Sequence, residues 1–344
     1  MSTRPTTRPR PRAATPMAFV LAVVEAYRRA RRTPDRALAE AQIAPEALQD
    51  PAARITAAQM ERLCDWAMRE LDDEALGWFR RRLPWGSYGM LARASLSSPD
   101  LGLALRRWGR HHRLLTDDIS VRVDVDGERA TIGLDEHVEL GVLREFCLVS
   151  MLRNVLGFGA WLVDSRLELR GAAFPFAAPA HAAAYALLFP GGPVRFGAAR
   201  AEVVLDAAYL ALPVRRDERA MNAMLRHALP LTVRPYRRDR LVVQRVRDCL
   251  RARPETLANA QALARALNLS TRSLHRQLQD EGASLQALKD EVRLATALDL
   301  LGRTQRPIKQ VAAAAGYASE KSFARAFRQW TGQAPSDYRS AGLR

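Results

Sequence analysis

A repeated helical pattern near the carboxyl end constrains the fold of this chain more than any other sequence feature. One copy reads LARALNLSTRSLHRQL from Leu263, and the other reads VAAAAGYASEKSFARAF from Val311. The copies align at an offset of 48 residues, with one extra residue in the turn of the second. Each copy predicts a helix, a short turn and a second helix with inward-facing apolar residues. The repeat therefore predicts two helix-turn-helix units, whose second helices enter the major groove of DNA.

Residues typical of helix ends support an all-α region from residue 239 onward. Ser270, Ser284 and Ser319 occupy predicted N-cap positions, and Gly282 and Gly302 follow predicted helix ends. The long helix after Ser284 would join the two units. The predicted helices span 239–252, 259–267, 271–280, 285–301, 308–315, 320–330 and 335–340.

Positive charge is concentrated in the same region. Residues 234–344 hold 21 Lys and Arg against 10 Asp and Glu, and residues 1–16 hold four Arg and no acid. The 217 residues between them carry only +1 of the total net charge of +16. A basic excess confined to one part of a chain favours a nucleic-acid partner.

Outward positions on the two second helices carry side chains that can contact base edges. An arginine fork matches O6 and N7 of guanine, and lysine reaches the same atoms. The alternative is an ordinary solvated helix face, but the repeat, the basic excess and the match between Arg276 and Arg325 favour base reading. The candidate residues are Arg272, His275 and Arg276 in the first copy, and Glu320, Lys321 and Arg325 in the second.

Residues 17–213 alternate between helical and strand-like patterns, which predicts an α+β domain. A charged stretch broken by prolines, 214–238, is predicted to link it to a DNA-binding domain at 239–344. Residues 1–16, rich in Pro, Thr and Arg, are predicted to be a disordered basic tail. Helices are expected at 17–32, 56–71, 99–115 and 143–156, and strands at 119–125, 130–134, 166–170 and 201–205.

The sequence shows no pattern typical of a catalytic, metal or cofactor site. Cys64, Cys147 and Cys249 lie far apart, which excludes a disulfide framework and fits a reducing cytoplasm. His111 and His112 lack further ligands at helical spacing, so they are interpreted as a surface or hydrogen-bonded pair. Apolar runs are expected to fall short of the ~18 to 20 residues that a membrane helix needs. We therefore expect a cytoplasmic protein without a membrane partner, metal or cofactor.

Six aromatic residues of the front domain are candidates for lining a small-molecule pocket. Aromatic side chains are common in ligand pockets, but they are just as common in hydrophobic cores. Ordinary core packing is therefore the alternative for each of them. The candidates are Trp85, Tyr88, Trp161, Phe174, Phe176 and Tyr185.

A dense set of residues in the second repeat and after it carries a family resemblance. The set comprises Ile308, Val311, Ala312, Gly316, Tyr317, Ser319, Ser322, Phe323, Arg325, Phe327, Trp330, Gly332, Pro335, Tyr338 and Arg339. Through these residues, positions 239–341 resemble the AraC/XylS class of bacterial transcription factors. The resemblance implies two helix-turn-helix units joined by one long helix, here 284–301. It also implies base contacts from Arg272, His275, Arg276, Lys321 and Arg325, with Ala318 and Glu320 at further contact positions.

Two stretches of the front domain, 82–115 and 174–214, resemble the effector domain of the ornithine- and arginine-utilisation branch of that class. The resemblance implies an arabinose-binding-like N-terminal domain that takes a small-molecule effector, such as an amino acid or a related metabolite. It does not identify the effector of this chain.

Together these features predict an α+β effector domain followed by an all-α DNA-binding domain with two helix-turn-helix units. The expected function is a sequence-specific transcription regulator, an activator, that responds to a small molecule. Promoter DNA, RNA polymerase, the effector and a second copy of the chain are the expected partners. The alternative is an enzyme of small-molecule metabolism or DNA repair with an appended DNA-binding module. That alternative needs a reactive cysteine in a nucleophile setting, which none of the three cysteines has.

Overall fold

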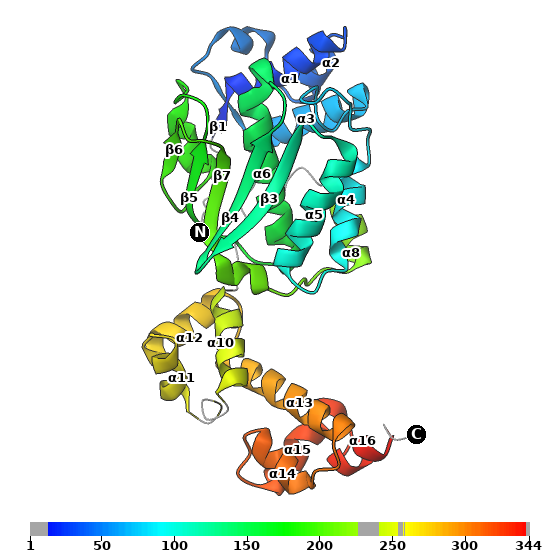
Figure 1. The fold of residues 1–344 in the computed structure, drawn as a ribbon, viewed down its shortest axis with the longest axis vertical. Coiled ribbons are helices and arrows are strands. Elements are labelled where there is room, and N and C mark those ends of the chain that lie inside the picture. The colour runs from blue at the N-terminus through cyan, green and yellow to red at the C-terminus, as the bar shows by residue number, and fades with distance from the viewer. Residues whose placement is uncertain (1–12, 226–240, 254–256, 258, 342–344) are drawn as a thin grey trace, which may run out of the picture. The chain divides into compact units, whose positions relative to one another are not determined.

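The chain forms two compact units, one up to Arg237 and one from Arg238 onward. The computed structural model describes residues 13–225, 241–253, 257 and 259–341 (Figure 1). The first unit combines sheets and helices, and the described part of the second is entirely helical. The predicted α+β and all-α fold classes are confirmed.

A five-stranded sheet lies at the centre of the first unit (Figure 1). Neighbouring strands are antiparallel, except that the strands at 169–174 and 194–196 pair in parallel. The first two strands form the predicted hairpin, and Gly127 takes a φ of 55° in its turn, a conformation that glycine adopts without steric strain. In spatial order the strands are β3 (Ile119–Asp126), β4 (Arg129–Glu136), β7 (Ala201–Asp206), β5 (Leu169–Phe174) and β6 (Val194–Phe196).

Helices α5 (Leu101–Leu115) and α6 (Arg144–Val163) pack against this sheet. At Gly109 the backbone of α5 comes so close to β3 that a Cβ would lie 2.8 Å from the Val121 carbonyl oxygen. The stretch Gly141–Val163 is long and apolar enough to cross a membrane, so the expectation of shorter apolar runs is wrong. Because 78% of its apolar window is buried inside the unit, α6 is the core helix.

A helical layer precedes the sheet in the chain. It holds α1 (Met17–Arg29), α2 (Asp35–Glu40), α3 (Ala57–Leu71) and α4 (Ser87–Leu96). Strand β1 (Ala13–Pro16) pairs with β2 (Arg54–Thr56) and contacts α1 and α3. The prediction of a disordered tail is therefore wrong for Ala13–Pro16, and residues 1–12 lie outside the described part.

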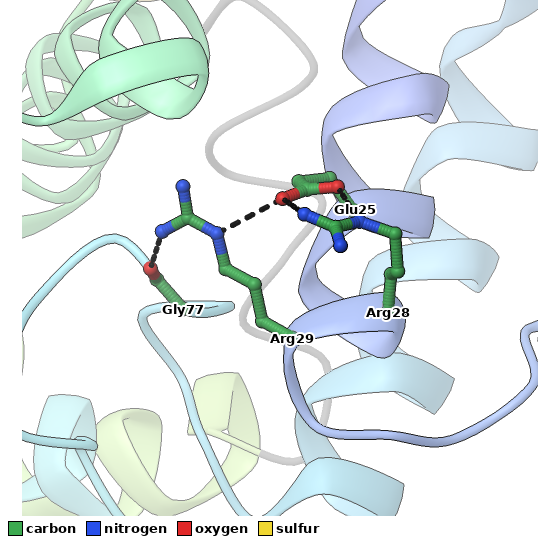
Figure 2. A network of polar contacts seen from close by, with 4 residues as sticks. All are labelled: Glu25, Arg28, Arg29 and Gly77. Atoms are coloured by element: carbon green, nitrogen blue, oxygen red, sulfur yellow. Dashed lines mark hydrogen bonds and ion pairs between the residues drawn. The ribbon is translucent and has the colours of Figure 1, made fainter.

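The end of α1 is joined to the loop after α3 by a polar network (Figure 2). Glu25 accepts hydrogen bonds from Arg28 at 2.6 Å and from Arg29 at 3.1 Å. Arg29 also donates to the Gly77 carbonyl oxygen at 3.2 Å. The hydrogen bond from Arg28, helped by Arg29, lowers the pKa of Glu25 to about 2.

The predicted linker begins too early in the chain. Helix α8 (Glu218–Leu225) buries Met221 and Met224 and contacts α4. Ahead of it, Arg216 donates to the Trp161 carbonyl oxygen at 2.8 Å. Residues up to 225 thus belong to the first unit because their apolar side chains complete its packing. The rest of the predicted linker, 226–238, lies outside the described residues.

Two hydrophobic cores organise the second unit, and one long helix contributes to both. Leu285, Leu288 and Val292 of α13 pack with the first repeat, whereas Ala297 and Leu301 pack with the second. The helices are α10 (Leu241–Ala252), α11 (Ala260–Ala266), α12 (Thr271–Asp280), α13 (Leu285–Arg303), α14 (Ile308–Ala314), α15 (Glu320–Thr331) and α16 (Pro335–Ala341).

Helix ends in the second unit follow the predicted pattern with one exception. Ser270, Ser284 and Ser319 are the N-caps of α12, α13 and α15, as predicted. Gly282 follows α12 with a φ of 71°. The prediction for Gly302 is wrong, because α13 continues through Arg303 before its C-cap at Thr304.

Candidate DNA-reading helices and effector cavities

The two repeats share hydrogen bonds as well as sequence. Each second helix begins at a serine whose Oγ accepts from a backbone N–H three residues on, at 3.1 Å for Ser270 and 3.2 Å for Ser319. The turns match too, because Asn268 and Gly316, 48 residues apart, take φ values of 55° and 77°. Asparagine and glycine are the residues that best tolerate this left-handed conformation. The repeat is therefore one structural motif used twice.

All six predicted base-reading side chains are exposed on α12 and α15. Leu274 and Leu278 of α12 are buried, as are Phe323 and Phe327 of α15, so each helix turns its charged face outward. None of the six forms a side-chain hydrogen bond or an ion pair with any of the described residues. The donors of the five basic side chains and the acceptor oxygens of Glu320 are thus available for a ligand. The six are Arg272, His275, Arg276, Glu320, Lys321 and Arg325.

The long helix α13 holds its two cores on opposite faces. At about 100° per residue, the centre of the stripe Leu285–Leu288–Val292 lies roughly 170° around the helix from Ala297 and Leu301. Ala295, on which a single continuous stripe would depend, is exposed. The phase between the two helix-turn-helix units is therefore set by the helical twist between Val292 and Ala297.

Arg293 joins the two helix-turn-helix units at the middle of α13. Its guanidinium lies over the Tyr317 ring, 4.9 Å from the centroid, and donates to the Leu257 carbonyl oxygen at 3.3 Å. It also lies 3.6 Å from Asp290, and its side chain is only 14% exposed. A Cβ on Gly316 would meet Leu257 at 3.2 Å, so the turn of the second repeat packs on the first core. The two helix-turn-helix units are thus in direct contact with each other.

An aromatic cavity of about 80 Å³ lies in the first unit, between α3, α4, α5 and α6. Two of the predicted effector residues, Trp85 and Tyr88, line it. Trp85 is 42% exposed, with the Arg69 guanidinium 4.2 Å from its ring centroid. Further lining residues include Glu74, Trp78, Phe79, Trp108, His112 and Met151.

Four lining residues of the aromatic cavity have a buried polar atom that finds no hydrogen-bond partner in the described part of the chain. These atoms are Trp78 Nε1, Tyr88 Oη, Trp108 Nε1 and His112 Nδ1. Burial lowers the pKa of His112 to about 4 and raises that of the Tyr88 hydroxyl, so both are neutral at pH 7. The interpretation of His112 as a surface or hydrogen-bonded residue is wrong, because its ring is buried and stacked on Trp108 at 5.1 Å. A ligand with acceptor atoms suits this cavity.

A second cavity, the arginine cavity, has a volume of about 140 Å³ and adjoins the first. Met68, Trp78 and Asn154 line both. Arg153 is the one charged residue among its lining residues. It donates to the Leu188 carbonyl oxygen at 2.6 Å, at the end of helix α7 (Tyr185–Leu188), which closes one side. Helix α7 is held in turn by a hydrogen bond of 2.6 Å from Tyr185 to Glu145.

The other four predicted effector residues line neither cavity. Phe174, Phe176 and Tyr185 pack together, with ring centroids 5.4 and 5.0 Å from Phe174. Trp161 is buried beside Phe158, under the Arg216 guanidinium at 5.3 Å. At these four positions the structure shows packing between rings.

Sequence reasoning missed the residues that shape both cavities. Trp78 follows α3, whereas Trp108 and His112 lie on α5, and only the fold brings these two segments together. Arg153 did leave a signal, because it is a lone basic residue deep within the apolar stretch REFCLVSMLRNVLGFGAWLV. A charged side chain at such a position is seldom retained without a partner or a ligand.

Sequence comparison assigns both units to described families. Residues 32–214 match the family described as arabinose-binding domain of AraC transcription regulator, N-terminal, and residues 263–341 match a helix-turn-helix domain family. The ornithine utilization regulator of Pseudomonas aeruginosa is 30% identical over 302 residues, which cover 88% of this chain and 89% of that protein. An uncharacterized HTH-type transcriptional regulator of Mycobacterium tuberculosis is 30% identical over 155 residues, 45% of each chain.

Solved structures include further similar proteins. The transcriptional regulator CdpR of Pseudomonas aeruginosa is 24% identical, with 89% of this chain and 96% of that chain covered and a TM-score of 0.33. The matched N-terminal family and the two relatives at 30% identity are transcription regulators and not enzymes, so the enzyme alternative is wrong. With matched families over both units and a regulator similar over most of its length, the chain belongs to the AraC family of transcription regulators with an arabinose-binding-type N-terminal domain.

Proposed function

We propose that the protein reads promoter DNA by placing α12 and α15 in successive major grooves on one face of the duplex. The observation that carries this is the pair of matched units, each with an exposed basic face, held in contact by Arg293. Helix α13, with 19 residues, is about 28 Å long at 1.5 Å per residue. Successive major grooves on one face lie about 34 Å apart.

Base reading is assigned to the exposed side chains of α12 and α15. Arg276 and Arg325 hold equivalent positions in the two units and suit bidentate contact with guanine. Arg272, His275 and Lys321 supply further donors, and Glu320 can accept from the amino group of cytosine. The remaining arginines of the basic unit would contact phosphates, which position the protein without reading sequence.

The first unit would regulate this binding in the cytoplasm by taking up a small-molecule effector. Two adjoining cavities in the unit support this role. Activation of transcription through contact with RNA polymerase, and action as a homodimer, belong to the same proposal. An amino acid is one candidate effector class, because a relative at 30% identity is named an ornithine utilization regulator.

Selection from randomised DNA tests the base-reading assignment. Arg276→Ala and Arg325→Ala should each lose preference at specific base positions, since a bidentate contact contributes ~1 to 3 kcal/mol of discrimination. Arg303→Ala is the matched control, because Arg303 lies at the end of α13 with its side chain 81% exposed. The control should retain the wild-type sequence preference. Wild-type preference in both test variants would refute the assignment.

A further inference from the structure

The walls of the aromatic cavity combine several aromatic rings with a single carboxylate. Glu74 is the one charged residue among the described residues that line it, since His112 is neutral. A cation is attracted to the faces of aromatic rings, and cages of such rings recognise ammonium groups. The cavity therefore suits a positively charged group better than an anion. The rings belong to Trp78, Phe79, Trp85, Tyr88 and Trp108.

The carboxylate of Glu74 has neutral partners in the described part of the chain. Its oxygens accept from the backbone N–H groups of Gly86 at 2.8 Å and of Tyr88 at 2.6 Å. Burial raises the pKa of Glu74 against these two hydrogen bonds, and the neighbouring Asp73 and Asp72 raise it further. An ionised carboxylate has about four lone-pair sites, so each oxygen can accept once more. A cation bound beside Glu74 would offset the cost of its burial.

Donor groups in the walls of the cavity indicate a second feature of the ligand. Nε1 of Trp78, Nε1 of Trp108 and Oη of Tyr88 find no acceptor in the described part of the chain. Trp78 and Trp108 are only 7% and 2% exposed, so their N–H groups need a partner inside the protein. An indole N–H only donates, so its partner must be an acceptor such as a hydroxyl or carboxylate oxygen. The ligand should therefore carry an oxygen as well as a positive charge.

Cavity size limits the enclosed part of the ligand. The volume of about 80 Å³ is roughly half that of an engineered cavity of ~150 Å³ that binds benzene. The enclosed part thus has roughly three to five non-hydrogen atoms, enough for an ammonium group, two carbons and an oxygen. Trp85 is 42% exposed, so this part of the lining lies at the surface and a longer molecule can extend there.

We infer that the aromatic cavity is the effector site, and that its ligand is a primary amine with an oxygen on the second carbon, as in amino alcohols and amino acids. The ammonium group binds between Glu74 and the rings, and the oxygen accepts from the indole N–H groups of Trp78 and Trp108. This inference rests on the proposed regulatory role of the first unit and specifies its ligand. Ethanolamine is the smallest molecule with both groups at this spacing.

Calorimetric titration of the full-length protein at neutral pH tests the chemistry with matched molecules. Propan-1-ol replaces the ammonium group of ethanolamine by a methyl group, and propan-1-amine replaces its hydroxyl. Ethanolamine should bind about tenfold or more tightly than propan-1-ol and about threefold or more tightly than propan-1-amine.

Variants of two carboxylates in the first unit test the role of Glu74. Glu74→Gln should abolish the preference for ethanolamine over propan-1-ol, because it removes the negative charge at nearly constant size. Glu136→Gln is the matched control, because Glu136 is partly buried, accepts two hydrogen bonds from Arg144 and is not among the lining residues of the cavity. The control should retain the preference.

Indole N–H signals in NMR spectra of the wild-type protein keep the test decisive if Glu74→Gln fails to fold. Ethanolamine should shift the signals of Trp78 and Trp108, which Trp78→Phe and Trp108→Phe assign. The signal of Trp161 should stay in place, because Trp161 lies outside the cavity beside Phe158.

Three outcomes would overturn the inference. They are no binding of ethanolamine to the wild type, equal binding of ethanolamine and either analogue, and unshifted signals of both Trp78 and Trp108. Footprinting of the same samples without amine measures DNA binding separately, so failure of the regulator proposal is recognised independently.

Discussion

Inserting one alanine between Leu294 and Ala295 should uncouple the two DNA-reading units. The position falls between the two apolar stripes of α13, which end at Val292 and resume at Ala297. Each core therefore keeps its buried α13 residues, and only the partly buried Leu294, which packs against the second core, falls on the other side of the insertion. The insertion lengthens the helix by only about 1.5 Å but rotates one half against the other by about 100°.

The rotation removes the contact between the units and, with it, the common face toward DNA. Loss of the Arg293–Tyr317 contact, now 4.9 Å, costs about 0.5 to 2 kcal/mol. The larger effect is on DNA, because α15 can no longer enter its groove while α12 occupies the other. Losing Lys321 and Arg325 at ~1 to 3 kcal/mol each gives about 2 to 6 kcal/mol, which is roughly 30-fold to 10⁴-fold in affinity.

Footprinting and fluorescence anisotropy on the selected promoter site measure this effect. The footprint should shrink to one groove, or vanish, at concentrations that protect the site with the wild-type protein. An alanine inserted between Thr304 and Gln305, in the loop after α13, is the control, because it adds the same residue without changing the helical phase. A folded helix insertion that protects two adjacent grooves with native affinity would show that the units are flexibly tethered.

Three further outcomes follow from the structure. His112 has a pKa of about 4 in the folded protein, but it gains a proton near pH 6.5 when the protein is unfolded. The free energy of unfolding should therefore fall by about 3 kcal/mol as the pH drops from 6.5 to 4. Chemical denaturation across that range should show a flatter profile for His112→Phe, and an unchanged profile would contradict this assignment. The logarithm of DNA affinity against that of salt should have a slope of about −4 or steeper if five phosphates are neutralised; a flat titration of the full-length protein would exclude that electrostatic footprint. Arg293→Met keeps the apolar stem but loses the guanidinium, so affinity for the two-groove site should fall about two- to 30-fold, while binding to a single half-site should be unaffected. Equal losses on both sites would show that Arg293 acts through folding alone.

Much of the second unit could be predicted from its sequence, because its helices depend on short-range patterns. Serine caps at Ser270 and Ser319, the turn positions Asn268 and Gly316, and the buried residues of each repeat act over spans of three to ten residues. Such signals keep their meaning in any tertiary context. Helices and strands of the first unit that have long periodic patterns were predicted for the same reason, including α3, α5 and the β3–β4 hairpin.

The elements and sites that the sequence left undetermined depend on contacts between distant segments. Strand β1 is four residues long and is stabilised by pairing with β2, about 40 residues away. The two cavities are lined by side chains from several helices, so no single stretch carries their pattern. Composition and local periodicity thus predicted two helix-turn-helix units and a nucleic-acid partner, and the family resemblance added the role of a regulator. The tertiary structure decided where Arg293 and Arg153 lie, because a charged side chain acquires its role from the groups that the fold packs around it.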